Sequence, residues 1–149
     1  MIKLRATVVR RRAPGSALLR GVVLFSCLAA SAAQATVRIH IDLSRQRMYV
    51  RASSGSYVWP VSTARSGYAT PRGSFAPTAM KRMHYSSKYD WSPMPHSIFF
   101  RGGYAIHGTY ATGALGRPVS HGCVRLAPGH AAALYEMVRR EGARISISR

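Results

Sequence analysis

Alternation of apolar and polar side chains is the feature that most constrains the fold of this chain. In residues 36–43 every second side chain is apolar, which predicts a strand with one buried face. Serine and glycine turns follow it, so the domain opens as a β-meander. Further extended segments are predicted at residues 46–50, 57–62, 74–83 and 144–149.

The middle of the chain predicts a loop and a hairpin. Residues 84–97 contain Pro93 and Pro95, which are typical of a long surface loop or flap. Two short apolar segments, 98–100 and 104–107, flank a Gly-Gly turn. This pattern predicts a hairpin that brings His107 to the end of a strand.

One helix is expected near the C-terminus. Within residues 130–141, Ala131, Leu134 and Val138 recur at helical spacing, and Gly142 follows as a left-handed cap. The resulting fold class is mostly β with one packed α-helix.

Residues 1–35 have the pattern of an export signal. Basic side chains are followed by an apolar run, and small residues end at Ala35, so cleavage before Thr36 is expected. The remaining residues, 36–149, fit a single domain in the periplasm. A twin-arginine signal at residues 10–12, a lipoprotein signal at Cys27 and an uncleaved membrane anchor remain alternatives.

The net charge indicates an anionic partner. The chain carries a formal charge of +18, of which residues 36–149 keep +12. Its 47% of hydrophobic residues argues against disorder, and after residue 35 no apolar run reaches the roughly 20 residues that a membrane helix needs. No reading helix or interleaving of aromatic with basic residues indicates nucleic-acid binding.

The strongest chemical signal is a thiol close to two histidines. If Cys27 leaves with the signal, Cys123 is the one thiol of an exported domain, either a nucleophile or a small buried hydrophobe. His107 is the better candidate for its base, because His121 lies only two residues before it. Gly122 permits a turn that directs backbone N–H groups at an oxyanion. A zinc site made of the two histidines and the cysteine is a weaker alternative, which a chelator would test.

These segments resemble the L,D-transpeptidase catalytic domain of bacterial cell-wall enzymes. The resemblance rests on Ile106-His107-Gly108-Thr109 and on residues 120–126, Ser-His-Gly-Cys-Val-Arg-Leu. Weaker matches extend over nearly all of residues 36–149. It implies a β-sandwich-like fold of mixed sheets and a site that needs no cofactor or metal.

The resemblance also implies residue roles. Cys123 is the nucleophile, His107 its proton acceptor and donor, and the Gly108 carbonyl orients the imidazole. The nucleophile loop and oxyanion hole would be formed by Ser120, His121 and Gly122. Substrate contacts would come from Arg125, Arg72 and Thr109. Apart from the resemblance, the aromatic residues Tyr85, Tyr89 and Trp91 are expected either to form a flap over the substrate or, equally, to pack in the core or anchor the loop. The sequence departs from the family at Arg125, where many relatives have Asn, and at Ala64-Arg65, where relatives usually have Gly.

The implied reaction is acyl transfer on peptidoglycan stem peptides. Cys123 would attack the diaminopimelate carbonyl of a tetrapeptide, release D-Ala and pass the acyl group to an amine. The amine would belong to another stem peptide, giving a 3→3 cross-link, or to an envelope protein, and carbapenem-type β-lactams would be possible inhibitors. Two alternatives remain open: a carboxypeptidase or amidase that uses water, and a non-catalytic basic module that binds the envelope.

Overall fold

The computed structural model describes residues 36–149. The predicted signal peptide and its cleavage site lie at or before the start of the described residues. Nine strands, one α-helix and one short 3₁₀ helix (η1) make up this part of the chain. In chain order they are β1 (Val37–Asp42), β2 (Arg47–Ala52), β3 (Gly55–Pro60), β4 (Gly73–Phe75), β5 (Ala79–Ser86), β6 (Ser92–Arg101), β7 (Tyr104–Gly108), η1 (Thr112–Ala114), β8 (Val124–Leu126), α1 (Pro128–Glu141) and β9 (Ala143–Ser148).

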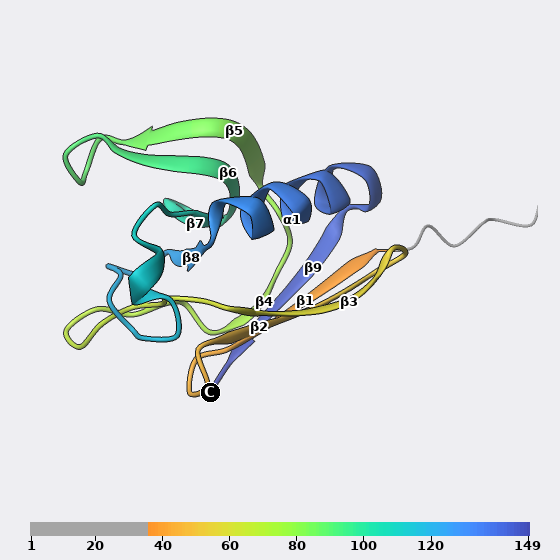
Figure 1. Cartoon of the computed structure of the whole chain (residues 1–149), viewed down its shortest axis with the longest axis horizontal. Coiled ribbons are helices and arrows are strands. Elements are labelled where there is room, and N and C mark those ends of the chain that lie inside the picture. Colours follow the sequence, from red (N-terminus) through yellow and green to blue (C-terminus); the bar gives the residue numbers. More distant parts are fainter. Residues whose placement is uncertain (1–35) are drawn as a thin grey trace, which may run out of the picture. The chain divides into compact units, whose positions relative to one another are not determined.

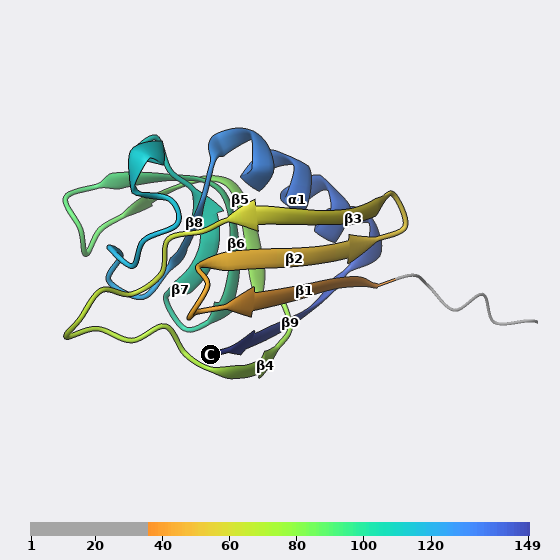
Figure 2. The same ribbon diagram turned by 60° about the horizontal axis from the view of Figure 1, so that its bottom comes forward.

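The strands form two mixed sheets (Figure 1). The first has the order β3-β2-β1-β9-β4, in which β1 pairs antiparallel with β2 and parallel with β9. The second has the order β5-β6-β7-β8, in which β7 and β8 run parallel. Figure 2 shows the first sheet face-on, with the meander β1-β2-β3 forming one half of it and β3 at the edge. The predicted fold class, mostly β with mixed sheets and one helix, is confirmed.

The core lies between the inner face of the five-stranded sheet, the second sheet and α1. Strand β1 alternates buried and exposed residues as its sequence predicts, because one face packs inward and the other faces solvent. Burial of each such aliphatic side chain contributes about 1.5–3 kcal/mol. The largest fully buried side chains include Ile39, Ile41, Met48, Ile98, Ile106, Leu126, Leu134 and Ile145.

Helix α1 begins two residues earlier than predicted. Pro128 occupies its first turn, where the missing N–H costs nothing and the fixed φ suits a helix. At the other end Gly142 has a φ of 68° and donates its N–H to the Val138 carbonyl at 2.8 Å. Within residues 36–149, no helix combines the length and apolarity needed to cross a membrane.

The prediction of a long loop over residues 84–97 is wrong. Strand β5 continues to Ser86, and β6 starts at Ser92 and contains both prolines. Proline is compatible with this part of β6 because only β5 pairs with it there; the pairing with β7 begins at Ile98. The flap is therefore a long hairpin with a short turn at residues 87–91.

Candidate active site

Cys123 and His107 come from two parallel strands of the smaller sheet. The register pairs His107 with Arg125 and Ile106 with Val124, and Cys123 directly precedes β8. Because alternate residues of a strand share a face, Cys123 and Arg125 lie on the same face as His107. All three line one groove, together with Thr109 and His121.

Residues 62–65, which follow β3, hold the loop that contains Cys123. Ser62 exchanges two backbone hydrogen bonds with Arg125, at 3.0 and 2.9 Å. Ser120 donates its N–H to the Thr63 carbonyl and accepts from the Arg65 N–H, both at 2.9 Å. Residues 62–65 thus act as a short strand that fixes the loop on both sides of Cys123.

Two buried hydroxyl groups fix the turn before Cys123. Ser120 Oγ donates to the Cys123 carbonyl at 2.6 Å and accepts from the Gly122 N–H at 3.0 Å. Thr70 Oγ1 donates to the Gly122 carbonyl at 2.9 Å and accepts from the Ala64 N–H at 3.1 Å. Each hydroxyl both donates and accepts a hydrogen bond, so neither of these two buried groups is left without a partner.

Gly122 is required by both conformation and space. Its φ is 131°, a region that L side chains rarely adopt. A Cβ there would overlap the Tyr104 ring and lie 3.0 Å from the Ala69 carbonyl oxygen. Its N–H is already bonded to Ser120 Oγ and therefore does not point freely into the groove.

Gln46 fixes the conformation of the 62–65 segment. It adopts a φ of 51°, and its side-chain amide donates to Thr63 Oγ1 at 2.6 Å and to the Leu43 carbonyl at 2.7 Å. Its Oε1 accepts the Thr63 N–H at 2.9 Å. A satisfied buried amide of this kind fixes one conformation of the segment.

The imidazole of His107 is buried and held by a main-chain oxygen. Its Nδ1 lies 2.7 Å from the Gly108 carbonyl oxygen. A carbonyl oxygen only accepts, so Nδ1 carries the proton and Nε2 of the neutral ring has a free lone pair. Burial lowers the pKa of His107 to about 4; Arg125 and His84 add to this, and the bond to Gly108 opposes it. Near neutral pH the ring is therefore an uncharged base.

Burial raises the pKa of the Cys123 thiol, and a backbone hydrogen bond with Ala105 and the charge of Arg125 partly offset this effect. The Sγ atom also lies 3.8 Å from the Gly103 carbonyl oxygen. Near neutral pH the site thus holds a thiol and a neutral imidazole rather than an ion pair.

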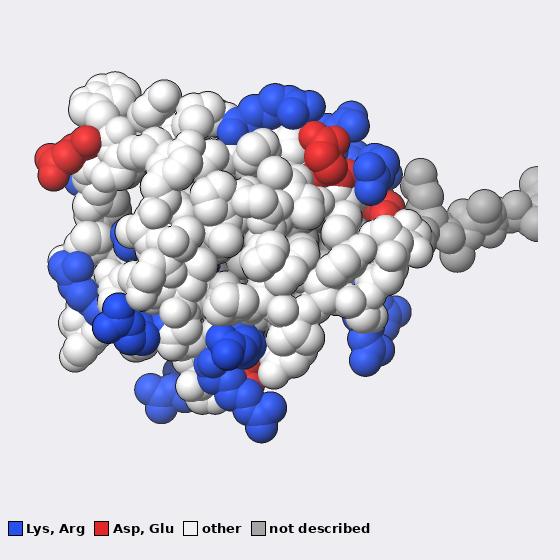
Figure 3. Space-filling view, in the orientation of Figure 1, with Lys and Arg blue, Asp and Glu red and all other residues white. Residues whose placement is uncertain are grey.

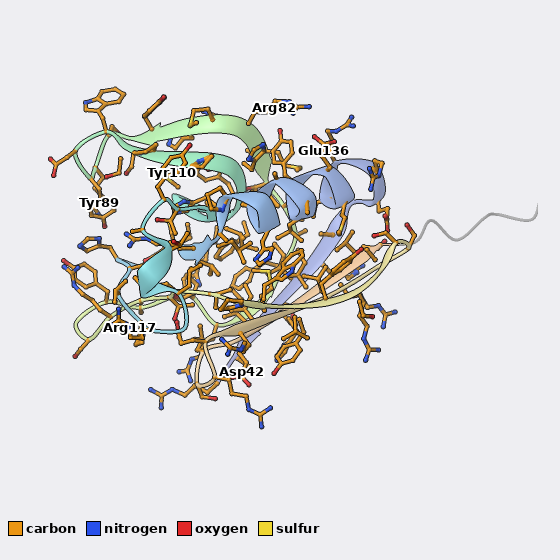
Figure 4. The ribbon with its side chains drawn as sticks, viewed as in Figure 1. Asp42, Arg82, Tyr89, Tyr110, Arg117 and Glu136 are labelled. Carbon is orange, nitrogen blue, oxygen red and sulfur yellow. The ribbon has the colours of Figure 1, made fainter. Side chains whose placement is uncertain are left out.

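His121 sits between two tyrosines at the groove's edge. The Tyr89 ring, from the β5–β6 turn, stacks on the imidazole with 4.4 Å between the ring centroids. The Tyr68 ring meets the imidazole edge-on, with 4.7 Å between the centroids. Figure 4 shows Tyr89 at the end of this hairpin, on the side of the domain where the loops gather. Three segments distant in sequence therefore meet at His121 and border the groove that contains Cys123.

The structure brings together half of the predicted substrate-contact and flap residues. Arg125, Thr109 and Tyr89 line the groove, whereas Arg72, Tyr85 and Trp91 do not. Arg72 is exposed just before β4. Among residues 36–149, no three His, Cys, Asp or Glu side chains are grouped so that they could hold a metal ion.

Local sequence patterns do not indicate that Thr70, Gln46 and Tyr68 support the site. Thr70 is 52 residues from its partner Gly122, and no local pattern reports such a contact.

The comparisons with known proteins agree on one family. The family model of the L,D-transpeptidase catalytic domain matches residues 36–147. None of the curated proteins is significantly similar in sequence. Among solved structures, an L,D-transpeptidase from Mycobacterium smegmatis is 25% identical with a TM-score of 0.69, over 77% of this chain and 59% of that one. An L,D-transpeptidase from Stackebrandtia nassauensis is 28% identical with a TM-score of 0.67, over 76% and 56% of the two chains.

A third solved structure is similar in fold alone. L,D-transpeptidase 3 from Mycobacterium tuberculosis, in complex with a faropenem-derived adduct, is 22% identical with a TM-score of 0.68, over 77% of this chain and 61% of that one. The chain spans less than two thirds of the length of each of these three relatives.

Proposed function

The chain belongs to the L,D-transpeptidase catalytic domain family, and from that premise we propose that it transfers peptidoglycan acyl groups through a thioester on Cys123. One observation carries the proposal. Cys123 and His107 share one face of paired strands and one groove, and the contact with Gly108 leaves His107 Nε2 free to take a proton. No carboxylate is needed to orient the ring.

In the first step the thiol attacks the diaminopimelate carbonyl of a stem tetrapeptide. As the S–C bond forms, the thiol proton passes to His107 Nε2. The tetrahedral intermediate then breaks its C–N bond, and His107 returns the proton to the departing D-Ala amine. The raised thiol pKa and the low imidazole pKa suit a proton transfer coupled to attack rather than a stored ion pair.

In the second step an amine attacks the thioester. His107 accepts its proton, the C–S bond breaks, and the proton returns to the thiolate. A diaminopimelate side chain as acceptor gives a 3→3 cross-link, an envelope protein amine gives a tethered protein, and water gives hydrolysis.

The oxyanion and the substrate carboxylates need donors. Because the Gly122 N–H is bonded to Ser120 Oγ, we assign the oxyanion contact to the Cys123 N–H. Arg125, paired in register with His107 and lining the groove, is the cation that we assign to a substrate carboxylate.

Export to the periplasm and inhibition by β-lactams complete the proposal. The basic and apolar pattern of residues 1–35 supports export. The Mycobacterium tuberculosis relative carries a faropenem-derived adduct, and a thiol that attacks an amide carbonyl is also able to open a β-lactam. We therefore expect penems and carbapenems to acylate Cys123.

The test uses purified disaccharide-tetrapeptide with wild type, Cys123→Ala and His107→Gln, and with His130→Gln as a matched control outside the groove. Wild type and the control should form a dimer that lacks one D-Ala, in the presence of EDTA as well, and the first two variants should not. D-Ala release without a dimer would favour the carboxypeptidase alternative. No turnover, together with envelope binding that survives Cys123→Ala, would favour the non-catalytic module.

A further inference from the structure

We propose that the outer face of the five-stranded sheet is a second, non-catalytic docking surface for the carboxylate-bearing peptidoglycan polymer. The identity of the polymer in this inference rests on the proposed function. The location of the surface rests on residues outside the Cys123 groove.

Three arginines form a row across neighbouring strands of this sheet. The register places Arg51 of β2 beside Arg38 of β1, and Arg38 beside Arg144 of β9. All three are exposed and share the solvent face, because their neighbours in sequence are buried in the core. Strands about 4.8 Å apart spread the three guanidinium groups over roughly 10 Å.

None of these three arginines is ion-paired within residues 36–149. The ion pairs of that part of the chain join Arg45 to Asp42, and join Arg82 and Arg139 to Glu136. Figure 3 shows the difference: acidic side chains accompany the basic ones near the helix, whereas the lower edge, on the sheet side, is mainly basic.

The row is unfavourable for the isolated domain. Like charges directly opposite on paired strands destabilise a sheet, and this row has two such pairs. A partner that supplies carboxylates between the guanidinium groups would remove the repulsion and add charge-assisted hydrogen bonds. The row of arginines is therefore better explained by binding to an anionic partner than by a contribution to the stability of the fold.

The three arginines line a groove with a volume of about 1100 Å³, which suits a sugar chain. Its lining includes Tyr49, and His40, whose ring stacks on Tyr49 at 6.0 Å and bonds to Ser146 Oγ at 3.0 Å. Flat rings with polar edges beside cations match a glycan strand that carries acidic peptides.

A polymer fits this face better than a lipid surface. Of the large exposed hydrophobic residues, only Val58 lines this groove, and the exposed side chains of Trp91 and Tyr110 lie elsewhere. Membrane-surface binding needs apolar side chains beside the basic ones. The docking groove and the Cys123 groove share no lining residue, so one extended polymer could occupy both and gain avidity.

The experiment is co-sedimentation of the full chain with purified sacculi at low and high salt. The test variant is Arg38→Gln/Arg51→Gln/Arg144→Gln. The control, Arg82→Gln/Arg139→Gln/Arg140→Gln, removes the same charge from exposed arginines on and opposite the helix. We expect the test variant to bind sacculi at least about tenfold more weakly at low salt, with soluble tetrapeptide turnover unchanged and a melting temperature equal to or above that of wild type.

Equal weakening in the control would reduce the effect to net charge and overturn the proposal. The same variants are also tested on vesicles of anionic phospholipid. If the test variant loses binding to the vesicles while its binding to sacculi stays intact, the proposal is overturned in favour of a membrane partner. Sacculus binding does not require turnover. If wild type fails to turn over tetrapeptide but shows the expected difference between the two triple variants, the proposed function fails and the docking surface stands.

Discussion

Cys123 and His107 are neutral at rest because His107 is buried and Cys123 is partly buried. Burial disfavours the thiolate of Cys123 and the imidazolium of His107 alike. Many thiol enzymes instead hold an ion pair. Here proton transfer from Cys123 to His107 accompanies attack on the bound substrate. The thiol should therefore react with the substrate but only slowly with small reagents that need a free thiolate.

Alkylation by iodoacetamide tests this state. Since only the thiolate reacts, and burial raises the pKa of the Cys123 thiol, the rate at Cys123 should stay low at pH 7 and rise only at a higher pH than that of a free cysteine. The measurement is the rate of loss of free thiol against pH, with Cys123→Ala as blank. A plateau between pH 6 and pH 8 would demonstrate an ion pair and contradict the account.

Thr70 is expected to be a positioning residue. Thr70→Val removes the hydroxyl that bonds to the Gly122 carbonyl and leaves two buried groups unpaired, which costs about 1–3 kcal/mol of stability. We expect kcat to fall about 10-fold or more through misplacement of Cys123, with KM little changed. Thr70→Ser, which keeps the hydroxyl, should restore kcat; a Ser variant as slow as the Val variant would show that the hydroxyl is not what matters.

At the residue scale, the sequence predicts the residues of the motif but not the residues that hold the motif in place. Cys123 and His107 stand in short local patterns, so the sequence alone identifies both as candidates. Thr70, Gln46 and Tyr68 act through contacts 17 to 53 residues away, and a single sequence contains no sign of such contacts.

At the scale of elements, the β5–β6 hairpin is one of the segments that border the groove. Its prolines led to the prediction of a loop, because the sequence does not show which side of a strand is unpaired. The alternating strands β1 and β9 and helix α1 were predictable, since each has a strong period of its own. The three-residue strand β8 was not, because it is defined by its partner β7.

Tyr89 should control access to the groove. Tyr89→Ala removes the ring stacked on His121 and so loosens the hairpin tip at the edge of the groove. We expect a higher KM for tetrapeptide and a larger share of hydrolysis relative to dimer, because water reaches the thioester more easily. Tyr85→Ala, on the same hairpin but outside the groove, is the control; an unchanged product ratio in Tyr89→Ala would rule out this role.

At the scale of the whole molecule, the buried base links stability to pH. The pKa of His107 falls from 6.5 to about 4 on folding, so between these values the unfolded chain binds a proton that the folded chain does not. The free energy of unfolding should therefore decrease as pH falls from about 6.5 to 4, by up to about 3 kcal/mol from this group.

Urea denaturation of wild type and His107→Gln at intervals from pH 4 to pH 8 measures this linkage. Wild type should lose stability steadily below pH 6.5, and the variant should lose less over the same interval. Because Asp42, Glu136 and Glu141 also have lowered pKa values, some loss should remain in the variant. Parallel curves for the two proteins would contradict the assignment of a buried neutral His107.

The central claim is the thioester, and intact-protein mass spectrometry after brief mixing with disaccharide-tetrapeptide tests it most directly. The account predicts a wild-type adduct with the mass of the disaccharide-tripeptide less one water, located on Cys123 and removed by hydroxylamine. It predicts no adduct on Cys123→Ala. Release of D-Ala without any adduct on wild type, or the same adduct on Cys123→Ala, would contradict it.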